Sequence, residues 1–385
     1  MTIKEDKRIY GLDALRAMAM LLGIVLHAAI AYKVFPNPTW PADDTYHSYW
    51  YDGAYWMIHT FRMQLFYLVA GFFARMLYLK IGEKDFISHR IKRIAIPFAG
   101  SLIFILPFTI APFLYYKYFI AEQLSYTDAM AHFRVQMFRW NGMAHLWFLY
   151  YLMIFYCGML LLLHRRIQNL IPAVLLKWSF NFGKIEQLLL ATLMLAGIHL
   201  LFFEGPVVEV STGIFPKISH LLYYGFFFIL GYYVHKNSGQ LELIARRTGL
   251  YLLTGTCIAL ALFSVVVLPT GITLSPVLVK AGVALQTMLL TFGVMGFFLR
   301  YLNRQNDTFR YISDAAYWLY LVHLAVVAGL QIAFLHSPVP GACRFFLVLL
   351  ITTGFGIGTY HLFIRYSFIG SILHGPRMRR KYVIN

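Results

Sequence analysis

Residues 54–78 read AYWMIHTFRMQLFYLVAGFFARMLY, a run that holds two arginines and no acidic residue. A helix rises 1.5 Å per residue, so a helix of about 20 residues crosses the roughly 30 Å of hydrocarbon in a bilayer. The run therefore predicts a transmembrane helix.

The composition of the whole chain matches a protein that has lipid as its solvent. The 385 residues are 60% hydrophobic and 18% aromatic, with a mean hydropathy of +0.64, values far from those of average soluble domains. A formal charge of +17 would favour nucleic acid in a soluble protein, but here the Lys and Arg residues fall between apolar runs instead of forming one patch. We therefore expect the lipid bilayer as partner and no nucleic acid.

Three cysteines lie singly inside apolar runs, so neither a disulfide framework nor a zinc site is indicated. No metal is expected.

Ten apolar segments are long enough to cross a membrane as helices. They are expected at residues 12–34, 54–78, 94–116, 144–163, 186–203, 217–235, 249–269, 277–299, 311–335 and 342–364. The sequence thus predicts an all-α polytopic helix bundle with about ten transmembrane helices, organised as a single integral membrane domain over residues 1–385. The first run is longer than the apolar core of a signal peptide, so we expect it to be retained.

The distribution of basic residues predicts which side each loop faces. Successive loops must lie on alternate sides of the membrane. Of the 33 Lys and Arg residues, 23 fall in the two termini and in the loops expected on the same side as the termini, whereas the loops on the opposite side hold six. Cytoplasmic loops carry the excess of positive charge, so both termini are expected in the cytoplasm.

Basic and imidazole side chains inside the first span are costly at membrane depth and call for an explanation. Arg16 and His27 are 11 residues apart, which brings them to within about 20° of one another around a helix. Arg16 is expected near the cytoplasmic side, where it either snorkels or binds a ligand. His27 is expected in the outer half, either in a structural hydrogen bond or in proton transfer.

The second span carries His59 and Arg62 on one helical face, at about the depth expected for His27. A buried guanidinium needs an anionic or carbonyl partner, and the spans hold almost no carboxylates. The missing anion is therefore expected to be a substrate.

Three further groups complete the candidate residues. Arg90, Lys92 and Arg93 precede the third span and suit phosphate groups, although an ordinary cytoplasmic basic cluster explains their charge equally well. His145 opens the fourth span. The ninth span carries a polar stripe of Tyr317, Tyr320 and His323, in which the two tyrosines either pack between helices or contact substrate.

In this combination of motifs the chain resembles the acyltransferase-3 superfamily of integral membrane acyltransferases. The motifs that carry the resemblance are Arg16-x10-His27, FRMQLFYLVAGFF at 61–73, Arg90-x2-Arg93, HLWFL at 145–149 and Tyr317-x2-Tyr320-Leu-Val-His323. They extend over nearly the whole chain. One departure is Ala70, where a serine before the glycine is usual in the family. Residues 59–64 look most like the branch of the family associated with adding succinyl groups to periplasmic glucans.

The resemblance implies a multi-pass protein of the bacterial inner membrane that uses cytoplasmic acyl-CoA as donor and a carbohydrate hydroxyl in the periplasm or cell envelope as acceptor. The acyl group is expected to be acetyl or succinyl. Our hypothesis is that the phosphate end of CoA is held by Arg16, Arg90, Lys92 and Arg93. His27 then acts as general base or as covalent nucleophile, and Arg62 stabilises the oxyanion or a succinyl carboxylate. Further catalytic candidates are His59, His145 and His323, and the residues expected to contact substrate are Tyr317, Tyr320 and Trp147.

Two other functions remain open from the residues alone. Intramembrane Arg and His also mark the pathways of transporters or flippases for anionic metabolites, although the two halves of the chain show no internal similarity. A lipid-linked sugar transferase would need acidic residues in its outer loops, for which Asp43, Asp44 and Asp52 are the candidates.

Overall fold

The computed structural model describes residues 9–43, 45–164, 169, 181–182 and 184–377, and all regular structure within them is helical. The helices in chain order are α1 (Tyr10–Ile30), α2 (Tyr49–Arg90), η1 (Ile91–Ala95), α3 (Ile96–Phe104), α4 (Leu106–Tyr115), η2 (Tyr116–Ala121), α5 (Tyr126–Met137), η3 (Ala144–Leu146), α6 (Trp147–Leu163), α9 (Ile185–Phe202), α10 (Ile218–Lys236), α11 (Gln240–Arg246), α12 (Thr248–Val266), α13 (Pro276–Tyr301), α14 (Asp307–Phe334), α15 (Gly341–Thr359), η4 (Tyr360–Ile364) and α16 (Phe368–Leu373).

Eight helical runs in this part of the chain are long and apolar enough to cross a membrane. They are Tyr10–Ile30, Tyr49–Ala121, Ala144–Leu163, Ile185–Phe202, Thr248–Val266, Pro276–Tyr301, Asp307–Phe334 and Gly341–Ile364. The predicted all-α polytopic membrane bundle is thereby confirmed. The cytoplasmic placement of both termini stays a prediction.

Each of the ten expected segments is helical, and two differences explain why eight runs qualify. The second and third expected spans belong to the single run Tyr49–Ala121, because the expected connection at 79–93 is itself helical. Within that run Gly82 has φ 78° and ψ 173°, a conformation that glycine adopts without a Cβ penalty, so α2 is kinked there. The helix α10 forms as expected but is not among the eight, since two histidines and four tyrosines make it less apolar.

The chain divides into two compact units, each assembled from three segments. The first unit contains Met1–Ala19, Gly53–Ser88 and Trp147–Asn306. The second unit contains Met20–Asp52, His89–Leu146 and Asp307–Asn385. The two halves of α1 therefore belong to different units, and the expectation of one functional domain over residues 1–385 stays a prediction.

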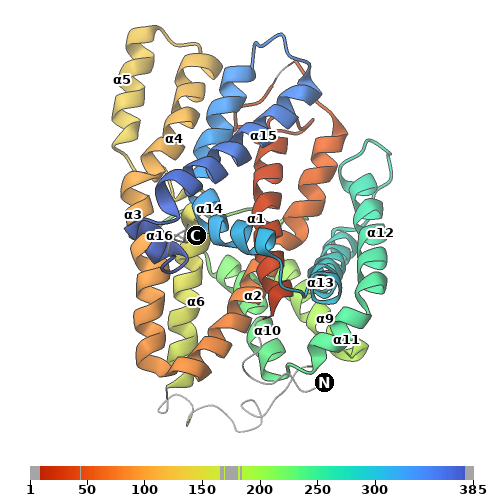
Figure 1. Cartoon of the computed structure of the whole chain (residues 1–385). Helices are drawn as coiled ribbons and strands as arrows, with labels where there is room; N and C mark the ends of the chain where they lie inside the picture. The colour runs from red at the N-terminus through yellow and green to blue at the C-terminus, as the bar shows by residue number, and fades with distance from the viewer. Residues whose placement is uncertain (1–8, 44, 165–168, 170–180, 183, 378–385) are drawn as a thin grey trace, which may run out of the picture. The chain divides into compact units, whose positions relative to one another are not determined.

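In the first unit, α12 and α13 run side by side (Figure 1), and α13 also packs against α9 and α11. The helices α2 and α10 approach one another backbone to backbone at two glycines. A Cβ added to Gly71 would collide with the carbonyl of Phe228, and one added to Gly231 would collide with the carbonyl of Leu68. Small residues permit such close crossings in membrane proteins, where there is no hydrophobic driving force between helices.

In the second unit, α14 packs against α15 and α4 packs against the short helix α5. The expected outer loop at 117–143 is thus partly helical. Ser125 caps α5 by accepting a hydrogen bond from the Asp128 amide at 3.2 Å, and Ala129 packs onto Leu114 and Tyr118. This packing explains why the segment folds back instead of remaining an open loop.

A buried ion pair fastens the beginning of α15 to the segment that follows α1. Arg344, only 8% exposed, pairs with Asp43 and also donates to the carbonyl oxygens of Val339 at 2.6 Å and Ser337 at 2.9 Å. All three nitrogens of this buried guanidinium donate hydrogen bonds. The pair therefore has a structural role, since removing one partner of a buried ion pair is strongly destabilising.

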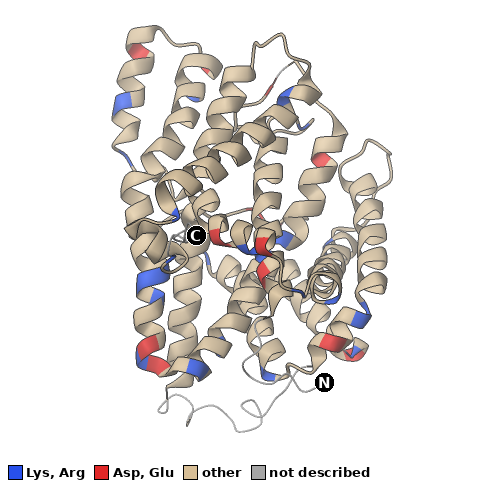
Figure 2. Ribbon diagram, viewed as in Figure 1, with Lys and Arg blue, Asp and Glu red and all other residues tan. Residues whose placement is uncertain are grey.

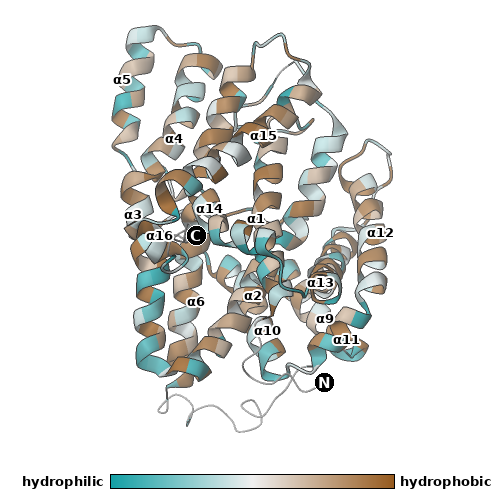
Figure 3. Cartoon of the chain, viewed as in Figure 1, coloured by the Kyte–Doolittle hydropathy of each residue, from teal (hydrophilic) through white to brown (hydrophobic). Residues whose placement is uncertain are grey.

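Two of the apolar helices, α6 and α12, contain no charged residue. Figure 2 shows α6 and α12 without Lys, Arg, Asp or Glu along their lengths, and Figure 3 shows them predominantly hydrophobic. Large apolar side chains on several spans are exposed, among them Phe104 at 69%, Leu193 at 69%, Leu253 at 66% and Leu350 at 71%. Exposed side chains of this kind on long apolar helices are typical of surfaces that face lipid.

Candidate active site

Three of the predicted catalytic residues meet inside the second unit. His27 comes from α1, His145 from η3 and His323 from α14. The ring centroids of His27 and His323 are 5.3 Å apart, and those of His145 and His323 are 5.4 Å apart. We call these three residues the histidine cluster. Positions 27, 145 and 323 in the sequence thus form one site, with His323 between the other two.

Main-chain contacts fix which nitrogen carries the proton in two of these rings. His145 Nε2 lies 3.1 Å from the Leu321 carbonyl oxygen, and His323 Nδ1 lies 2.8 Å from that of Tyr320. A carbonyl oxygen only accepts, so these nitrogens are the donors. In the neutral rings the basic nitrogens are therefore Nδ1 of His145 and Nε2 of His323. Within the described part of the chain, His145 Nδ1 is buried without a hydrogen-bond partner.

Tyr320 supports the cluster from α14. Its hydroxyl donates to the main-chain oxygen of His145 at 2.7 Å, and its ring lies 5.2 Å from the His145 ring. Tyr317 lies one turn earlier, with its ring 6.3 Å from that of Tyr320. A substrate role for the two tyrosines stays a prediction, and Tyr320 holds η3 in place whatever that role is.

Sequence reasoning missed the residues that surround His27. The indole of Trp40 stacks on the His27 ring at 5.5 Å with an interplanar angle of 6°. Gln331, 2% exposed on α14, accepts a hydrogen bond from Trp40 Nε1 at 2.9 Å. Its amide nitrogen also donates to the main-chain oxygens of His27 at 3.2 Å and Ala28 at 3.0 Å. One buried amide therefore ties the stacked indole to the end of α1 that carries His27. The signal that the sequence offered for Gln331 was a further polar residue in the ninth expected span.

Three of the four basic residues proposed for CoA phosphates, Arg90, Lys92 and Arg93, also lie in the second unit. Arg93 Nη1 donates to the Ile372 carbonyl oxygen at 2.8 Å, at the end of α16. Lys92 is exposed, and Arg90 is half-buried. Arg377 lies near the same helix end and forms two 2.7 Å contacts with the carboxylate of Asp314. Burial holds the pKa of His374 below its ordinary value, although the Asp314 carboxylate opposes this shift. A cluster of basic side chains of this kind can attract an anion, although Arg93 and Arg377 each have a protein partner.

Four predicted site residues belong to the first unit instead. His59 Nε2 donates to the Val208 carbonyl oxygen at 3.1 Å, and its ring stacks on Tyr55 at 5.0 Å. Arg62 is half-buried one turn further along α2. Arg16 is exposed, with its guanidinium 6.0 Å from the Phe73 ring. The fourth is Trp147.

Trp147 is 6% exposed and packs among aromatic rings, 5.1 Å from Tyr224 and 5.6 Å from Tyr151. The expected meeting of Arg62 with His27 joins residues of different units and stays a prediction.

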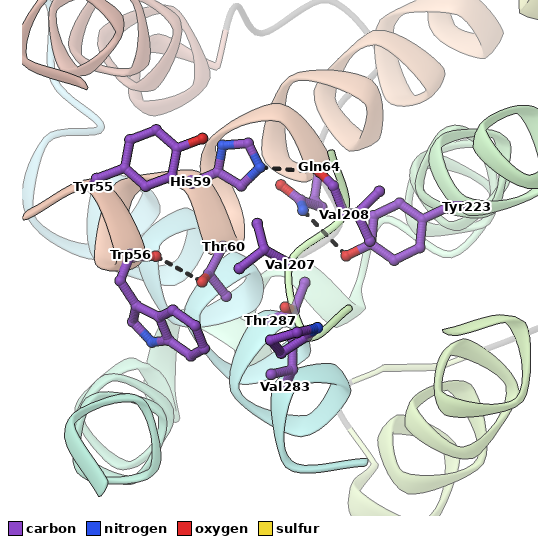
Figure 4. Close-up of a pocket in the computed structure, with 11 residues that line it drawn as sticks. Tyr55, Trp56, His59, Thr60, Gln64, Val207, Val208, Tyr223, Val283 and Thr287 are labelled. Carbon is purple, nitrogen blue, oxygen red and sulfur yellow. Dashed lines mark hydrogen bonds between the residues drawn. The ribbon is translucent and has the colours of Figure 1, made fainter. Parts of the chain in front are cut away.

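Figure 4 shows a small cavity in the first unit, which we call the α2–α10–α13 cavity. Its volume of about 20 Å³ has room for about one water-sized group. It is lined by Tyr55, Trp56, His59, Thr60, Gln64, Pro206, Val207, Val208, Tyr223, Val283 and Thr287. Aromatic rings and neutral polar groups therefore share its walls.

The segment 203–217 forms one wall of this cavity, and side chains from five helices hold it by its carbonyl oxygens. The contacts are Lys280 to Phe203 at 2.7 Å, His199 to Gly205 at 3.0 Å, His59 to Val208 at 3.1 Å, His220 to Glu209 at 2.5 Å and Tyr150 to Ile214 at 2.9 Å. Lys280 and His199, which are ionisable residues within α13 and α9, therefore have structural partners here.

Three other ionisable residues, Arg75, Asp52 and Lys33, also have partners. Arg75 donates to His235 Nδ1 at 2.7 Å. Asp52 accepts a hydrogen bond from the Val34 amide at 2.7 Å and lies 3.9 Å from the Lys33 ammonium. Burial lowers the pKa of Lys33 below its ordinary value, and the Asp52 carboxylate partly opposes this shift.

With Asp43 paired to Arg344, two of the three acids that a sugar transferase would use are already engaged. Asp44 lies outside the described residues. In the part of the chain that the structure describes, no three His, Cys, Asp or Glu side chains are arranged to hold a metal ion.

Comparison with known proteins gives a consistent result. The sequence profile described as an acyltransferase domain (acyltransferase family 3) matches residues 9–361. Glucans biosynthesis protein C of Shigella dysenteriae and that of Escherichia coli K12 are each 28% identical over 228 residues, which is 58% of this chain and 57% of theirs. The alignment thus spans little more than half the length of these relatives. No solved structure matches.

Proposed function

Since this chain belongs to the acyltransferase-3 family, we propose that it is a membrane acyltransferase that moves an acetyl or succinyl group from acyl-CoA to a hydroxyl of a cell-envelope glycan. The observation that carries the proposal is the histidine cluster, in which His27 lies between a stacked indole and a second imidazole. The relatives named for glucan biosynthesis support a carbohydrate as the acceptor.

In the proposed reaction His27 takes the proton from the acceptor hydroxyl as its oxygen attacks the thioester carbonyl carbon. The tetrahedral intermediate then expels the CoA sulfur, which leaves as the thiol after protonation by the same imidazole. The new C–O bond replaces the C–S bond, and one proton moves from the acceptor to CoA. General base catalysis of this kind contributes roughly 10² to 10⁴ in rate.

His323 is proposed to support His27 in this step. Its Nδ1 is held by main-chain carbonyls, so its Nε2 is the basic nitrogen. A base beside His27 stabilises the imidazolium that forms when His27 takes the proton. His145 is held on the other side of His323 and limits the movement of that ring.

At the donor end, Arg90, Lys92 and Arg93, with Arg16, are proposed to bind the phosphates of CoA by charge-assisted hydrogen bonds. Arg62 is proposed to bind the oxyanion or the free carboxylate of a succinyl group. We further propose that the protein resides in a bacterial inner membrane, with donor and acceptor on opposite sides.

The proposal is tested with the purified full-length protein in nanodiscs, given radiolabelled acetyl-CoA or succinyl-CoA and a neutral gluco-oligosaccharide. We expect release of CoA and labelling of the oligosaccharide, and we expect His27→Ala to reduce transfer at least about 100-fold. His361→Ala is the matched control, because this histidine lies on η4 and contacts Tyr311 at 3.1 Å, outside the cluster. A transporter would bring about neither release nor labelling, and full transfer by His27→Ala would exclude His27 as base or nucleophile.

A further inference from the structure

The connection between α1 and α2 folds back on α1 and carries one side chain onto His27. We call its described residues, 31–43 and 45–48, the strap. The Asp43 amide donates to the Ala31 carbonyl oxygen at 2.9 Å, so the strap returns to the end of α1 from which it starts. The strap, His27 and the helices α4, α14 and α15 all belong to the second unit.

Trp40 is the residue of the strap that lies on His27, and three helices surround its indole. The indole stacks on the His27 ring of α1, and its Nε1 donates to Gln331 of α14. The Phe113 ring of α4 meets it edge-on, with ring centroids 5.1 Å apart and an interplanar angle of 75°. Trp40 is consequently only 9% exposed. Its position on His27 then depends on where the strap holds its main chain.

A short and stiff link joins Trp40 to Asp43. Two residues separate them, and the first is Pro41. The proline ring fixes its own φ at about −65° and confines the residue before it to extended conformations. A displacement of Asp43 is therefore passed on to Trp40, because the residues between them have little freedom to absorb it.

Asp43 is fastened to a fixed point on α15. The carboxylate is 3% exposed, pairs with Arg344 and accepts a hydrogen bond from the Thr45 hydroxyl at 2.6 Å. Arg344 is itself held by the carbonyl oxygens of Val339 and Ser337, just before and at the beginning of α15. Charge-assisted hydrogen bonds are roughly twice as strong as neutral ones. Arg344 thus fixes the strap three residues from Trp40.

A second contact sets the distance between the strap and α15. Gly341 is the first residue of α15, and a Cβ added to it would lie 2.1 Å from Cγ of Tyr46 in the strap. No larger residue fits between the Tyr46 ring and the helix without displacing one of them. The strap is therefore held on α15 by one ionic contact and one steric contact.

We propose that Arg344 is a positioning residue for acyl transfer, which acts through Asp43 and the strap to hold the Trp40 indole on His27. This assignment rests on the proposed acyltransferase function and goes beyond the structural role of the ion pair. A role in stability alone changes the amount of folded protein. A positioning role lowers kcat of the folded protein and leaves the KM for acyl-CoA unchanged, because a misplaced base affects the chemical step.

Two variants displace the strap by different means. Asp43→Asn keeps the shape of the side chain and removes its charge, whereas Gly341→Ala adds a Cβ against Tyr46 and removes no charge. Gly354→Ala is the matched control on α15, because its Cβ would meet nothing within 4 Å. We expect Asp43→Asn and Gly341→Ala to lower kcat per folded protein roughly 10-fold, with the KM for acyl-CoA unchanged, and Gly354→Ala to keep both values. The measurement is CoA release in nanodiscs.

Combination with Trp40→Leu shows whether the ion pair acts through the indole. Residues that act as one unit are not additive, so Asp43→Asn should lower kcat little further once Trp40 is replaced. If Asp43→Asn does not fold, Gly341→Ala takes its place in this comparison. Equal reductions of kcat with and without Trp40 would contradict the proposal, and so would a wild-type kcat in the strap variant.

Hydroxyl-radical footprinting with mass spectrometry tests the strap without relying on activity. Trp40 should be protected in the wild-type protein, while Trp50, which is 76% exposed, serves as the oxidised reference. We expect Trp40 to lose its protection in Asp43→Asn and Gly341→Ala and to keep it in Gly354→Ala. Unchanged protection in both strap variants would overturn the proposal. If the wild-type protein releases no CoA, the proposed function fails, and the footprint still decides whether Arg344 fastens the indole to His27.

Discussion

At the scale of single residues, the surroundings of His27 show how a buried amide can position an imidazole. Gln331 uses its oxygen for Trp40 and its nitrogen for two main-chain carbonyls of α1, so the indole and the helix end are held by the same side chain. The stacked indole leaves the His27 ring little freedom to rotate. We infer that Gln331 and Trp40 act on catalysis through His27, as positioning residues.

Replacing Gln331 by Leu is expected to lower kcat roughly 10-fold while the KM for acyl-CoA stays near the wild-type value, because a misplaced base affects the chemical step and not donor binding. Trp40→Phe keeps a ring over His27 and loses only the hydrogen bond, so it should retain more activity than Trp40→Leu. The measurements are kcat and KM by CoA release. Equal activities for the two Trp40 variants would show that stacking on His27 has no role.

The residues of the histidine cluster were accessible from the sequence, since imidazoles are rare at membrane depth and each one stands out. Trp40, Gln331 and the carbonyls of segment 203–217 were not. A main-chain carbonyl has no residue type that identifies it, and Gln331 lies 291 residues from Trp40. Contacts of this kind depend on tertiary packing, which spacing along one helix does not report.

At the scale of helices, length and apolar composition were sufficient to predict ten helical segments but not their ends. The expected connection at 79–93 is helical because Gly82 absorbs a kink within a run that otherwise continues. The expected loop at 117–143 contains α5 because Ala129 and its neighbours find an apolar surface on α4 and η2. In the second case packing against neighbouring helices, which a hydropathy profile does not report, decided the outcome.

The crossing of α2 and α10 makes a prediction about stability. Gly71→Ala or Gly231→Ala places a Cβ against a main-chain carbonyl, so the two helices must separate, at a cost of about 1–3 kcal/mol or more. Gly158→Ala on α6 is the matched control, because its Cβ would meet nothing within 4 Å, and its helix propensity rises by up to about 1 kcal/mol. Thermal unfolding in detergent is the measurement. If Gly71→Ala and Gly158→Ala behave alike, the close crossing is absent in the membrane.

At the scale of the whole molecule, the positions of Lys and Arg predict that the chain begins and ends in the cytoplasm. A fluorescent protein that matures only in the cytoplasm should therefore be bright when fused after residue 385. Single cysteines introduced at exposed Thr39 and Phe138, in a variant without native cysteines, should react with a membrane-impermeant thiol reagent in intact spheroplasts. The opposite labelling pattern would invert the topology and, with it, the side on which the acceptor is modified.

The attachment of segment 203–217 also has a consequence for how the first unit is made. Its five anchors arrive with α2, α6, α9, α10 and α13, and the last of these is synthesised some 60 residues after the segment itself. During biosynthesis the Phe203 carbonyl oxygen lacks its partner until Lys280 emerges, whereas the other four carbonyls find theirs on helices made earlier or directly afterwards. The last contact of the segment therefore forms only after α13 has been synthesised.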